Sequence, residues 1–557
     1  MIYPFFQKIN KSRDFSFEGK AGIKCKYIDK ELDAKKIDIV FPCKGEDENI
    51  ELQALVMKNE ELTYIPEAKR VTDEKYKLLI SEKDSIVKIQ IHCSGNKSFL
   101  YALFAIKRMY EANLFPIGEI LDYPLFETRG YIEGFYGTPW KAEKRPEMMY
   151  LLASYGENTH YYAPKDDLYH RKKWRELYPE KELLALKELV DLSNDLCMSF
   201  CYCIAPGYSM QYSSEEDFAV LCRKTQQLHS IGISSFGLLL DDIPAELFYE
   251  EDKAIYSETV NAHISLCKRY FAFVKALGAK LTVCPLEYFG DCSGYYISRL
   301  GQELDEGISL FFTGEDICSK TIKSSDAIKF ERSTSKQPLY WDNYPVNDAE
   351  MFKEMHIAPI KGRDKDLFLH SKGIISNCME YFECNKIPLV TIAMYLWNPL
   401  KYEPEEAFTY AVNYIIPEDE REDFLLLSEH FRTSCLKAEN SYIMNSVLSE
   451  ALMCFETGHF PEAIKVLTEY VAKVHLAVSR ISPRFDGIYK ELKEWIDKYI
   501  LMSDILENCL MLLSGNTENR EEAKKLIAEK MRIYNNNATI LTEFSFRAFV
   551  EWALEAE

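Results

Sequence analysis

The sequence contains no apolar run near the roughly 20 residues that a membrane-spanning helix needs, so we expect no membrane segment. Its 16 cysteines include no CxxC pair, and the closest two, Cys201 and Cys203, are separated by one residue within an apolar run. The paired spacing of a zinc site is therefore missing, and free thiols in a reducing cytosol are the favoured state.

Positive charge is also scarce. Lys and Arg total 67 against 88 Asp and Glu, which gives a formal net charge of −21. A nucleic-acid-binding protein usually presents a basic surface, so this balance argues against a nucleic-acid partner. The first residues lack the basic stretch and following apolar stretch that mark a signal peptide, and we therefore expect a soluble, cytoplasmic protein. A secreted form whose signal peptide has been removed would show the same sequence and is the alternative.

Apolar residues, by contrast, are plentiful enough for large cores. Hydrophobic residues make up 47% of the chain and aromatic residues 13%, a composition typical of globular proteins and not of disordered ones. At about 150 residues per domain, 557 residues predict two to four domains. Three patterns along the chain divide it into three such regions.

The N-terminal region, residues 1–124, is predicted to be a small α/β domain. Residues 76–80 and 86–92 are short β-type runs, and the second alternates between apolar and polar residues. Residues 98–110 have the apolar spacing of a helix. A proline within residues 121–125 ends the pattern.

Residues 125–402 repeat a unit of apolar run, loop and long helical interval, which predicts a (β/α)₈ barrel. The eight predicted strands cover residues 130–137, 158–163, 199–205, 234–240, 280–287, 308–313, 339–344 and 373–377. A doubly wound sheet is the alternative. That fold favours a glycine-rich phosphate turn after an early strand, and neither GxGxxG nor GxxxxGK[ST] is present.

Residues 403–557 carry no strand pattern and predict an all-α domain. Glycine and proline punctuate seven amphipathic stretches that show no repeat period. They cover residues 405–415, 423–439, 442–456, 461–480, 489–513, 521–535 and 541–556.

Polar and reactive residues follow six of the eight predicted barrel strands. Because barrel active sites are built at the carboxyl ends of the strands, these residues are expected to converge on one mouth. A single aspartate or asparagine there is often only a helix cap or a turn. The residues concerned lie at positions 133–140, 163–167, 238–243, 285–288, 341–345 and 376–378.

Asp241 and Asp242 form the sharpest of these features, because two adjacent carboxylates follow an apolar run directly. They can be a helix N-cap pair before Pro244 or a surface turn. They can also be an acid/base pair, since close carboxylates in different surroundings take different pKa values. A divalent metal site is a third possibility, but no Glu/His ligand set surrounds the pair in the sequence.

Six segments of the predicted barrel carry a recognisable set of motifs. They are RGYIEGFYGTPW at 129–140, YAPKDDLYHR at 162–171, WRELYP at 174–179, LLDDI at 239–243, CPLEY at 284–288 and WDNYPVND at 341–348. These segments resemble glycoside hydrolase family 84, the O-GlcNAcases and the related bacterial β-N-acetylglucosaminidases, some of which are named hyaluronidases. The resemblance covers the predicted barrel and extends less closely to the small α/β domain before it.

This resemblance implies roles for individual residues. Asp241 orients and polarises the N–H of the substrate's 2-acetamido group, and Asp242 is the general acid for the leaving oxygen and then the base for water. The implied sugar-binding residues are Gly134, Lys165, Asn343 and Asp348 for the hydroxyls, Asn377 and Tyr288 for the acetamido group and reaction centre, and Tyr136, Cys284 and Trp341 as the pocket lining.

The resemblance also implies the reaction. Family members are retaining hydrolases that use the substrate's own acetamide oxygen as the nucleophile, an exception to the two-carboxylate scheme. No metal and no organic cofactor is implied. The expected substrate is a glycoprotein or glycan with terminal β-linked GlcNAc; a modified protein, a mucin-type glycan and a hyaluronan fragment all fit.

The chain departs from the family pattern at His160, Ser209, Leu286 and Cys378, none of which carries an implied catalytic role. Two alternatives to the predicted activity stay open. A β-N-acetylgalactosaminidase differs only in the O4 configuration of its substrate, near Asp348 and its loop. A glycan-binding pseudoenzyme is expected to have lost Asp241 or Asp242, and both are present.

Overall fold

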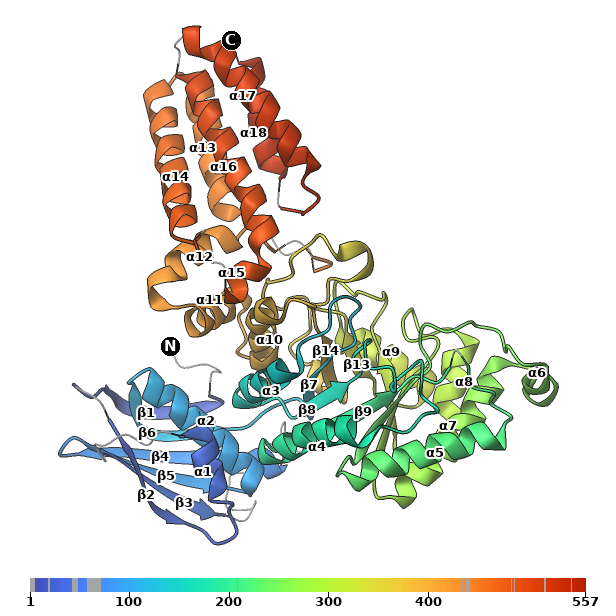
Figure 1. Cartoon of the computed structure of the whole chain (residues 1–557). Coiled ribbons are helices and arrows are strands. Elements are labelled where there is room, and N and C mark those ends of the chain that lie inside the picture. Colours follow the sequence, from blue (N-terminus) through green and yellow to red (C-terminus); the bar gives the residue numbers. More distant parts are fainter. Residues whose placement is uncertain are drawn as a thin grey trace. The chain divides into compact units, whose positions relative to one another are not determined.

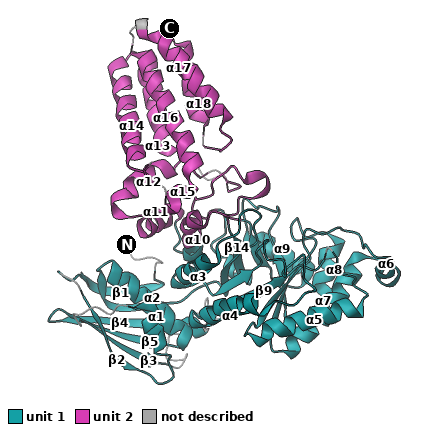
Figure 2. Cartoon of the chain, viewed as in Figure 1, with its two compact units in different colours: residues 1–343, 362–378, 392–403 teal, residues 344–361, 379–391, 404–557 magenta. Residues whose placement is uncertain are grey.

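The computed structural model describes residues 6–18, 21–42, 49–57, 72–207, 209–432, 434–436, 441–481, 483–484, 486–514, 517–541 and 543–556. The chain forms two compact units (Figure 2). The first comprises residues 1–343, 362–378 and 392–403, and the second comprises residues 344–361, 379–391 and 404–557. Residues 1–5 lie outside the described residues. They are part of the N-terminal stretch in which no signal-peptide pattern was found.

The first unit begins with a six-stranded mixed sheet in the order β1-β6-β4-β5-β3-β2 (Figure 1). Helix α2 packs on β4 and β5, and in β5 the apolar residues Val87, Ile89 and Ile91 are buried while the residues between them are not. The elements are β1 (Lys8–Phe15), β2 (Ile23–Ile28), α1 (Lys35–Val40), β3 (Ile50–Val56), the 3-10 helix η2 (Thr72–Glu74), β4 (Tyr76–Lys83), β5 (Ile86–Cys93), α2 (Asn96–Glu111) and β6 (Phe115–Asp122).

The two strands and the helix predicted for this domain are present as β4, β5 and α2. Four further strands were not predicted. Strand β1 lies at the sheet edge and is exposed along nearly its whole length, so it has no apolar alternation to detect. Strand β6 contains Pro116 and Gly118, which indicate a turn in sequence, and Gly118 has a φ of +147° beside a register shift.

The predicted barrel is confirmed. Eight parallel strands close in the order β7-β8-β9-β10-β11-β12-β13-β14 (Figure 1). Their inward-facing side chains form one core. Their bounds are β7 (Thr128–Ile132), β8 (Thr159–Tyr162), β9 (Ser199–Ile204), β10 (Ser235–Leu239), β11 (Lys280–Cys284), β12 (Ile308–Phe312), β13 (Leu339–Asp342) and β14 (Gly373–Asn377).

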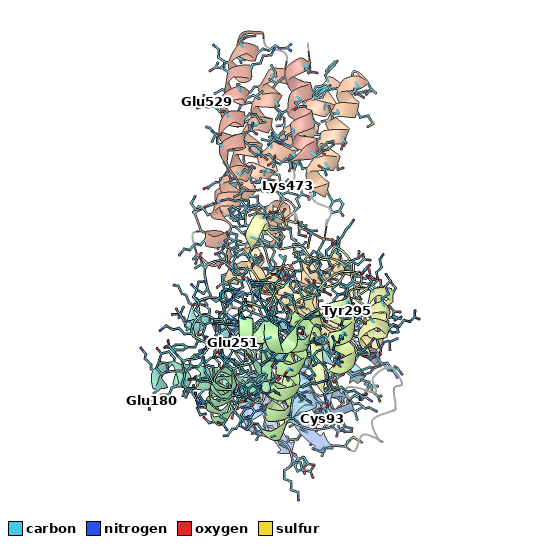
Figure 3. The ribbon with its side chains drawn as sticks, turned by 90° about the vertical axis from the view of Figure 1, so that its right-hand side faces the viewer. Cys93, Glu180, Glu251, Tyr295, Lys473 and Glu529 are labelled. Carbon is cyan, nitrogen blue, oxygen red and sulfur yellow. The ribbon has the colours of Figure 1, made fainter. Side chains whose placement is uncertain are left out.

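Helices alternate with these strands along the chain, and Figure 3 labels Glu180 at the start of α4, Glu251 in α6 and Tyr295 at the start of α8. They are α3 (Arg145–Ser154), α4 (Glu180–Asp195), α5 (Glu215–Ser230), α6 (Glu250–Tyr256), α7 (Thr259–Ala276), α8 (Tyr295–Glu303), α9 (Ser324–Thr334) and α10 (Phe382–Trp397), with the 3-10 helices η3 (Ala142–Lys144), η4 (Ala349–Met351) and η5 (Leu367–Leu369).

Seven of the eight strands end before their predicted last residue. Strand β7 ends at Ile132 instead of residue 137, and β11 ends at Cys284 instead of residue 287. The residues that follow leave the sheet and become the loops at the carboxyl end of the barrel. Those loops carry the side chains predicted to form the site.

The predicted helical tail is also confirmed as the main part of the second unit. In α14 the buried residues Ala463, Leu467, Val471, Val474 and Val478 recur every three or four positions, the spacing of one helix face. The helices are α11 (Pro404–Ile415), the 3-10 helix η6 (Glu418–Glu420), α12 (Arg421–Ser428), α13 (Tyr442–Glu456), α14 (Phe460–Ile481), α15 (Gly487–Glu491), α16 (Lys493–Leu513), α17 (Thr517–Asn536) and α18 (Phe544–Glu555).

Of the predicted tail helices, one ends early and another is divided in two. The helix predicted over 423–439 ends at Ser428, and residues 433 and 437–439 lie outside the described residues. The helix predicted over 489–513 is interrupted at Leu492, between α15 and α16. Within the described ranges, no helix is long and apolar enough to cross a membrane, and each described cysteine is a free thiol.

Candidate active site

Asp241 and Asp242 follow β10 directly at the carboxyl end of the barrel. The preceding residue, Leu240, still belongs to the sheet edge, because its N–H donates to the carbonyl oxygen of Cys284 at 2.9 Å. Asp242 has a φ of +53°, in the left-handed region that non-glycine residues rarely adopt. The backbone therefore turns sharply between the two carboxylates, leaving Asp241 partly buried and Asp242 exposed.

Two tyrosines from different strands reach Asp242. The Tyr136 hydroxyl, in the loop after β7, donates to Asp242 Oδ2 at 3.4 Å, and the Tyr288 hydroxyl, after β11, donates to Oδ1 at 3.3 Å. These residues are far apart in sequence, as expected for loops that converge on one barrel mouth. Burial, with Asp242 and then Asp241 nearby, raises the pKa of Tyr288, so its phenol keeps its proton at neutral pH.

The carboxyl group of Asp241 lies among both cations and another acid. Burial raises its pKa above the ordinary aspartate value; Lys165 lowers it, Asp242 raises it further, and Arg171 adds a smaller lowering. The surroundings of Asp241 and Asp242 are thus different, although the residues are adjacent. Burial by itself favours the protonated form of Asp241, and the charge of Lys165 is the largest influence that favours its ionised form.

Lys165 and Arg171 come from the loop between β8 and α4. The Lys165 ammonium lies 4.8 Å from the centre of the Tyr136 ring, a cation–π distance, and Arg171 Nη1 donates to the Tyr136 hydroxyl at 3.0 Å. Lys165 was predicted as a site residue. Arg171 was not given a role, because no sequence signal pairs it with a tyrosine 35 positions away.

Trp341, Asn343, Asn377 and Gly134 form a continuous hydrogen-bonded chain on another side of the mouth. Trp341 Nε1 and Asn377 Nδ2 both donate to Asn343 Oδ1 at 3.0 Å, and the Gly134 N–H donates to Asn377 Oδ1 at 3.1 Å. Asn343 Nδ2 in turn donates to the Ile317 carbonyl oxygen at 2.8 Å. The structure brings these four predicted residues together and orients both amides.

Gly134 leaves no room for a side chain. A Cβ atom at this position would lie 2.6 Å from Trp341 Cζ2 and 3.0 Å from Asn377 Oδ1. The loop after β7 therefore approaches the indole closely only because residue 134 is glycine.

Cys284 is buried in the barrel core at the end of β11. Burial, followed by the charges of Asp241 and Asp242, raises its pKa well above the ordinary thiol value. It therefore presents a neutral, weakly polar surface beneath the two aspartates.

Asp348 is the one predicted site residue that belongs to the second unit. It precedes the 3-10 helix η4, and its carbonyl oxygen accepts the Met351 N–H at 3.0 Å. Its implied contact with the sugar stays a prediction.

Two buried ion pairs lie behind the strands that carry the site, and sequence reasoning missed both. Arg145 Nε lies 2.9 Å from both carboxylate oxygens of Glu133, next to Gly134. Burial opposes the charge on Glu133, but Arg145 and then His160 hold its pKa below the ordinary value.

The second pair joins Arg363 to Asp342. Asp342 is the last residue of β13 and stands between Trp341 and Asn343 in the sequence. Arg363 Nε donates to Asp342 Oδ2 at 2.8 Å and Nη2 to Oδ1 at 2.5 Å. Both pairs are almost completely buried, so removing either partner would leave an unpaired buried charge. They fix the ends of β7 and β13.

The four departures from the family pattern have identifiable surroundings. His160 stacks on Tyr131, with ring centres 4.5 Å apart, and alternates with Tyr161, which faces the barrel core. Ser209 Oγ accepts from Trp174 Nε1 at 3.0 Å in the loop after β9. Leu286 donates its N–H to the Tyr296 hydroxyl at 3.3 Å, and Cys378 is buried after β14.

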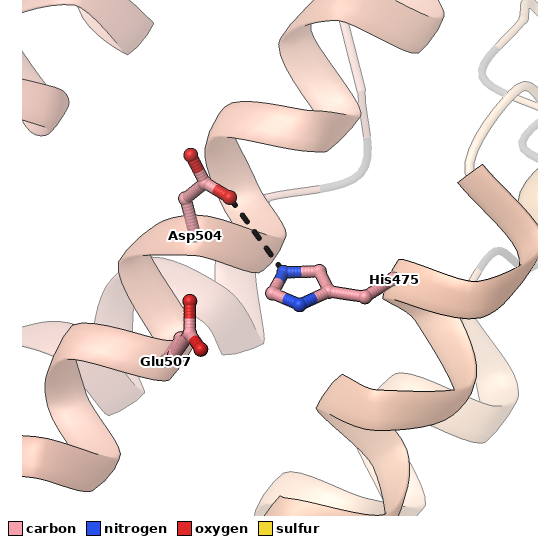
Figure 4. A group of neighbouring side chains, drawn as sticks. All are labelled: His475, Asp504 and Glu507. Carbon is pink, nitrogen blue, oxygen red and sulfur yellow. Dashed lines mark ion pairs between the residues drawn. The ribbon is translucent and has the colours of Figure 1, made fainter. Parts of the chain in front are cut away.

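Among the described residues, one group of His, Asp and Glu brings possible metal-ligand atoms within 4.8 Å of one another. It consists of His475 on α14 with Asp504 and Glu507 on α16 (Figure 4). His475 Nε2 lies 3.6 Å from Asp504 Oδ1, but Lys530 on α17 already pairs with Asp504 Oδ2 at 2.6 Å. We therefore interpret the group as an ion-pair network that links three helices.

The chain was compared with known proteins. A family model described as beta-N-acetylglucosaminidase matches residues 129–429. The Protein O-GlcNAcases of Rattus norvegicus and Mus musculus are each 33% identical to it over 272 residues, which is 47% of this chain. That match spans only 29% of the length of those relatives.

Solved structures give a fuller match. A mutant of the O-GlcNAc hydrolase of Thermobaculum terrenum is 31% identical, with a TM-score of 0.74 over 77% of this chain and 94% of that chain. The protein named CpGH84B superposes with a TM-score of 0.80 over 99% of this chain and 100% of that chain; at 23% identity, that likeness concerns the fold alone.

Proposed function

The chain belongs to the β-N-acetylglucosaminidase family, glycoside hydrolase family 84, and from that premise we propose that it is a retaining exo-β-N-acetylglucosaminidase. Its substrate would be terminal β-linked GlcNAc on a glycoprotein or glycan. The observation that carries this proposal is the pair Asp241 and Asp242 at one barrel mouth in different surroundings.

In the first step, the acetamide oxygen of the substrate attacks the anomeric carbon from within the same sugar. The bond to the leaving oxygen breaks, and Asp242 gives that oxygen its proton. The attacking group is already tethered beside the reacting carbon, so little entropy is lost in bringing the two together. The product of this step is a bicyclic oxazoline-type intermediate.

Positive charge grows on the acetamido group during that attack, and an ionised Asp241 facing the N–H stabilises it. Lys165 supports this task, because its charge lowers the pKa that burial has raised. In the second step Asp242 takes a proton from water, and the resulting oxygen nucleophile opens the intermediate at the anomeric carbon. Because the anomeric carbon undergoes two displacements in succession, its configuration is retained.

The remaining residues would bind the sugar. Gly134, Lys165, Asn343 and Asp348 are assigned to the hydroxyls, and Asn377 and Tyr288 to the acetamido group and reaction centre. The chain of hydrogen bonds from Trp341 to Gly134 supports this assignment, since it orients the amides before any ligand arrives. Tyr136, Cys284 and Trp341 would line the pocket.

The function is tested with 4-nitrophenyl glycosides that differ in one feature each. We expect hydrolysis of the β-GlcNAc compound and much slower hydrolysis of the β-glucoside and the α-linked GlcNAc compound. A β-glucoside cleaved as fast as the β-GlcNAc compound would overturn the substrate-assisted mechanism. Comparing the rates on the β-GalNAc and β-GlcNAc compounds, which differ only in the configuration at O4, shows which of the two sugars the enzyme prefers.

A second series tests the nucleophile directly. Successive fluorination of the N-acetyl methyl group makes the acetamide oxygen less nucleophilic without changing the leaving group. We expect kcat/KM to fall steadily along the series, and proton NMR to show the β-anomer of GlcNAc as the first product. A flat series or a first-formed α-anomer would contradict the proposal.

A further inference from the structure

Buried contacts hold the backbone of Arg171 in place. The residue before it, His170, is fully buried, and its Nδ1 lies 2.7 Å from the Cys203 carbonyl oxygen. The carbonyl oxygen of His170 accepts the Ala205 N–H at 3.0 Å. These contacts fix the backbone in the loop between β8 and α4 from which the side chain of Arg171 extends.

The guanidinium group of Arg171 donates a hydrogen bond from Nη1 to the Tyr136 hydroxyl oxygen at 3.0 Å. A phenol has only one hydrogen. Because its oxygen accepts from Arg171, that hydrogen is directed to the other side, where Asp242 Oδ2 lies 3.4 Å away. Hydrogen bonds in such a chain polarise one another, so the cation strengthens the donor that reaches the aspartate.

The position of Asp242 makes it dependent on such support. It is exposed, it has a left-handed backbone conformation, and Tyr136 and Tyr288 donate to its two oxygens at distances above 3.2 Å. Two donors on two oxygens define the plane of a carboxylate. The Lys165 ammonium over the Tyr136 ring holds the body of that tyrosine, and Arg171 holds its hydroxyl.

We propose that Arg171 is a positioning residue for the general acid and acts on Asp242 through the Tyr136 hydroxyl. This inference rests on the proposed function, because it assumes that Asp242 delivers the proton. Loss of Arg171 would free the Tyr136 hydroxyl to rotate. Of the two tyrosines, only Tyr288 would then orient the carboxyl group of Asp242.

A different role for Arg171 makes a different prediction. Its charge also acts on Asp241, so it can serve only to keep that carboxylate ionised. Asp241 acts on the nucleophile, so a loss of rate caused through Asp241 does not depend on how readily the leaving group departs. Losses through Asp242 do depend on it, since a good leaving group needs little help from an acid.

The experiment compares Arg171→Met with Lys172→Met, a matched control that removes one positive charge from the exposed neighbouring position. The substrates are phenyl β-GlcNAc, with a poor leaving group, and 4-nitrophenyl β-GlcNAc, with a good one. For Arg171→Met we expect kcat/KM to fall at least ~10-fold on the first and less than ~3-fold on the second. Lys172→Met should match the native enzyme on both.

Tyr136→Phe tests the path of the effect. It removes the hydroxyl that links Arg171 to Asp242, so it should show the same dependence on the leaving group. The double variant Arg171→Met, Tyr136→Phe should be no more than ~2-fold worse than the worse single variant, because both substitutions break one chain. Fully multiplied losses would overturn the inference.

Chemical rescue separates positioning from a change in folding. In Arg171→Ala, added guanidinium at a non-denaturing concentration should restore phenyl β-GlcNAc hydrolysis, and the same concentration of potassium chloride should not. Arg171→Lys keeps the charge and should recover part of the loss. Absence of rescue in a folded variant would contradict the proposal.

The outcomes also separate this inference from the proposed function. A native enzyme inactive on both β-GlcNAc compounds would overturn the proposed function and this inference with it. An active native enzyme whose Arg171→Met variant loses equally on both substrates, or loses nothing, would overturn the inference alone.

Discussion

Asp241 and Asp242, after β10, differ from Trp341, Asn343 and Asn377, after β13 and β14, in burial and in the hydrogen bonds that hold them. Trp341 and Asn377 are 6% and 5% exposed, and bonds of 3.0 Å join both to Asn343. Asp242 is exposed and is held by tyrosine hydroxyls at 3.3 and 3.4 Å.

This difference matches two tasks. Sugar binding benefits from groups that are oriented beforehand, since orienting them on binding costs entropy. In a retaining hydrolysis the attacking water takes the place of the leaving oxygen, so one acid/base residue at the solvent-exposed side of the site can protonate the first and deprotonate the second. We therefore expect substitutions of Asp242 and of its tyrosine contacts to change kcat in a way that depends on the leaving group, and substitutions near β13 and β14 to change KM.

The largest effect is expected for Asp242→Asn on substrates with poor leaving groups. Loss of general acid catalysis should lower kcat/KM for phenyl β-GlcNAc by about 100- to 10,000-fold, and far less for the 4-nitrophenyl compound. Asp316→Asn is the control, because Asp316 is an exposed acid on the mouth loop after β12. Equal losses on the two substrates would remove Asp242 from the acid role.

Asp241→Asn is expected to lower kcat by about 100- to 1,000-fold, with little rescue by a good leaving group. The missing anion acts on the acetamido group, so both formation and breakdown of the intermediate should slow. A stable thiazoline that mimics the intermediate should bind the native enzyme tightly and the variant weakly by calorimetry. Unchanged affinity in a folded variant would rule out the polarising role.

Gly134→Ala tests the preformed half of the mouth. The added Cβ would lie 2.6 Å from Trp341 Cζ2, so the indole or the loop after β7 must move. We expect a free energy of unfolding lower by about 1–3 kcal/mol and a raised KM with the same leaving-group dependence as the native enzyme. A changed leaving-group dependence would mean that the two halves of the mouth are not separate.

The smallest effect concerns pH. Asp241 has to be ionised, so activity should fall on the acid side as it takes a proton. Burial raises its pKa and Lys165 opposes that rise. In Lys165→Met the pKa of Asp241 rises further, and the acid limb of the kcat profile should move to higher pH. Lys172→Met should leave the limb in place, and an unmoved limb in Lys165→Met would show that another group sets it.

Much of this site was predictable because a barrel has a simple rule of position. Polar residues after apolar strands lie at one mouth whatever their separation in sequence. The position of Asp241, Asn343 and Asn377 at the mouth needed no more than that, whereas their individual roles come from the resemblance and stay predictions. Arg171 and the pairs Glu133–Arg145 and Asp342–Arg363 needed more, because their partners are set by side-chain direction and not by spacing.

The sequence by itself determined the eight barrel strands, the helical tail and the two adjacent carboxylates, because each depends on local hydrophobic pattern or on residue identity. Only the tertiary structure decided that Asp241 is partly buried near Lys165 and Arg171. It also decided that Asp242 is exposed and accepts hydrogen bonds from two tyrosines. The physical reason is that the electrostatic environment of a side chain comes from groups brought close by barrel closure, and those groups are dispersed along the chain.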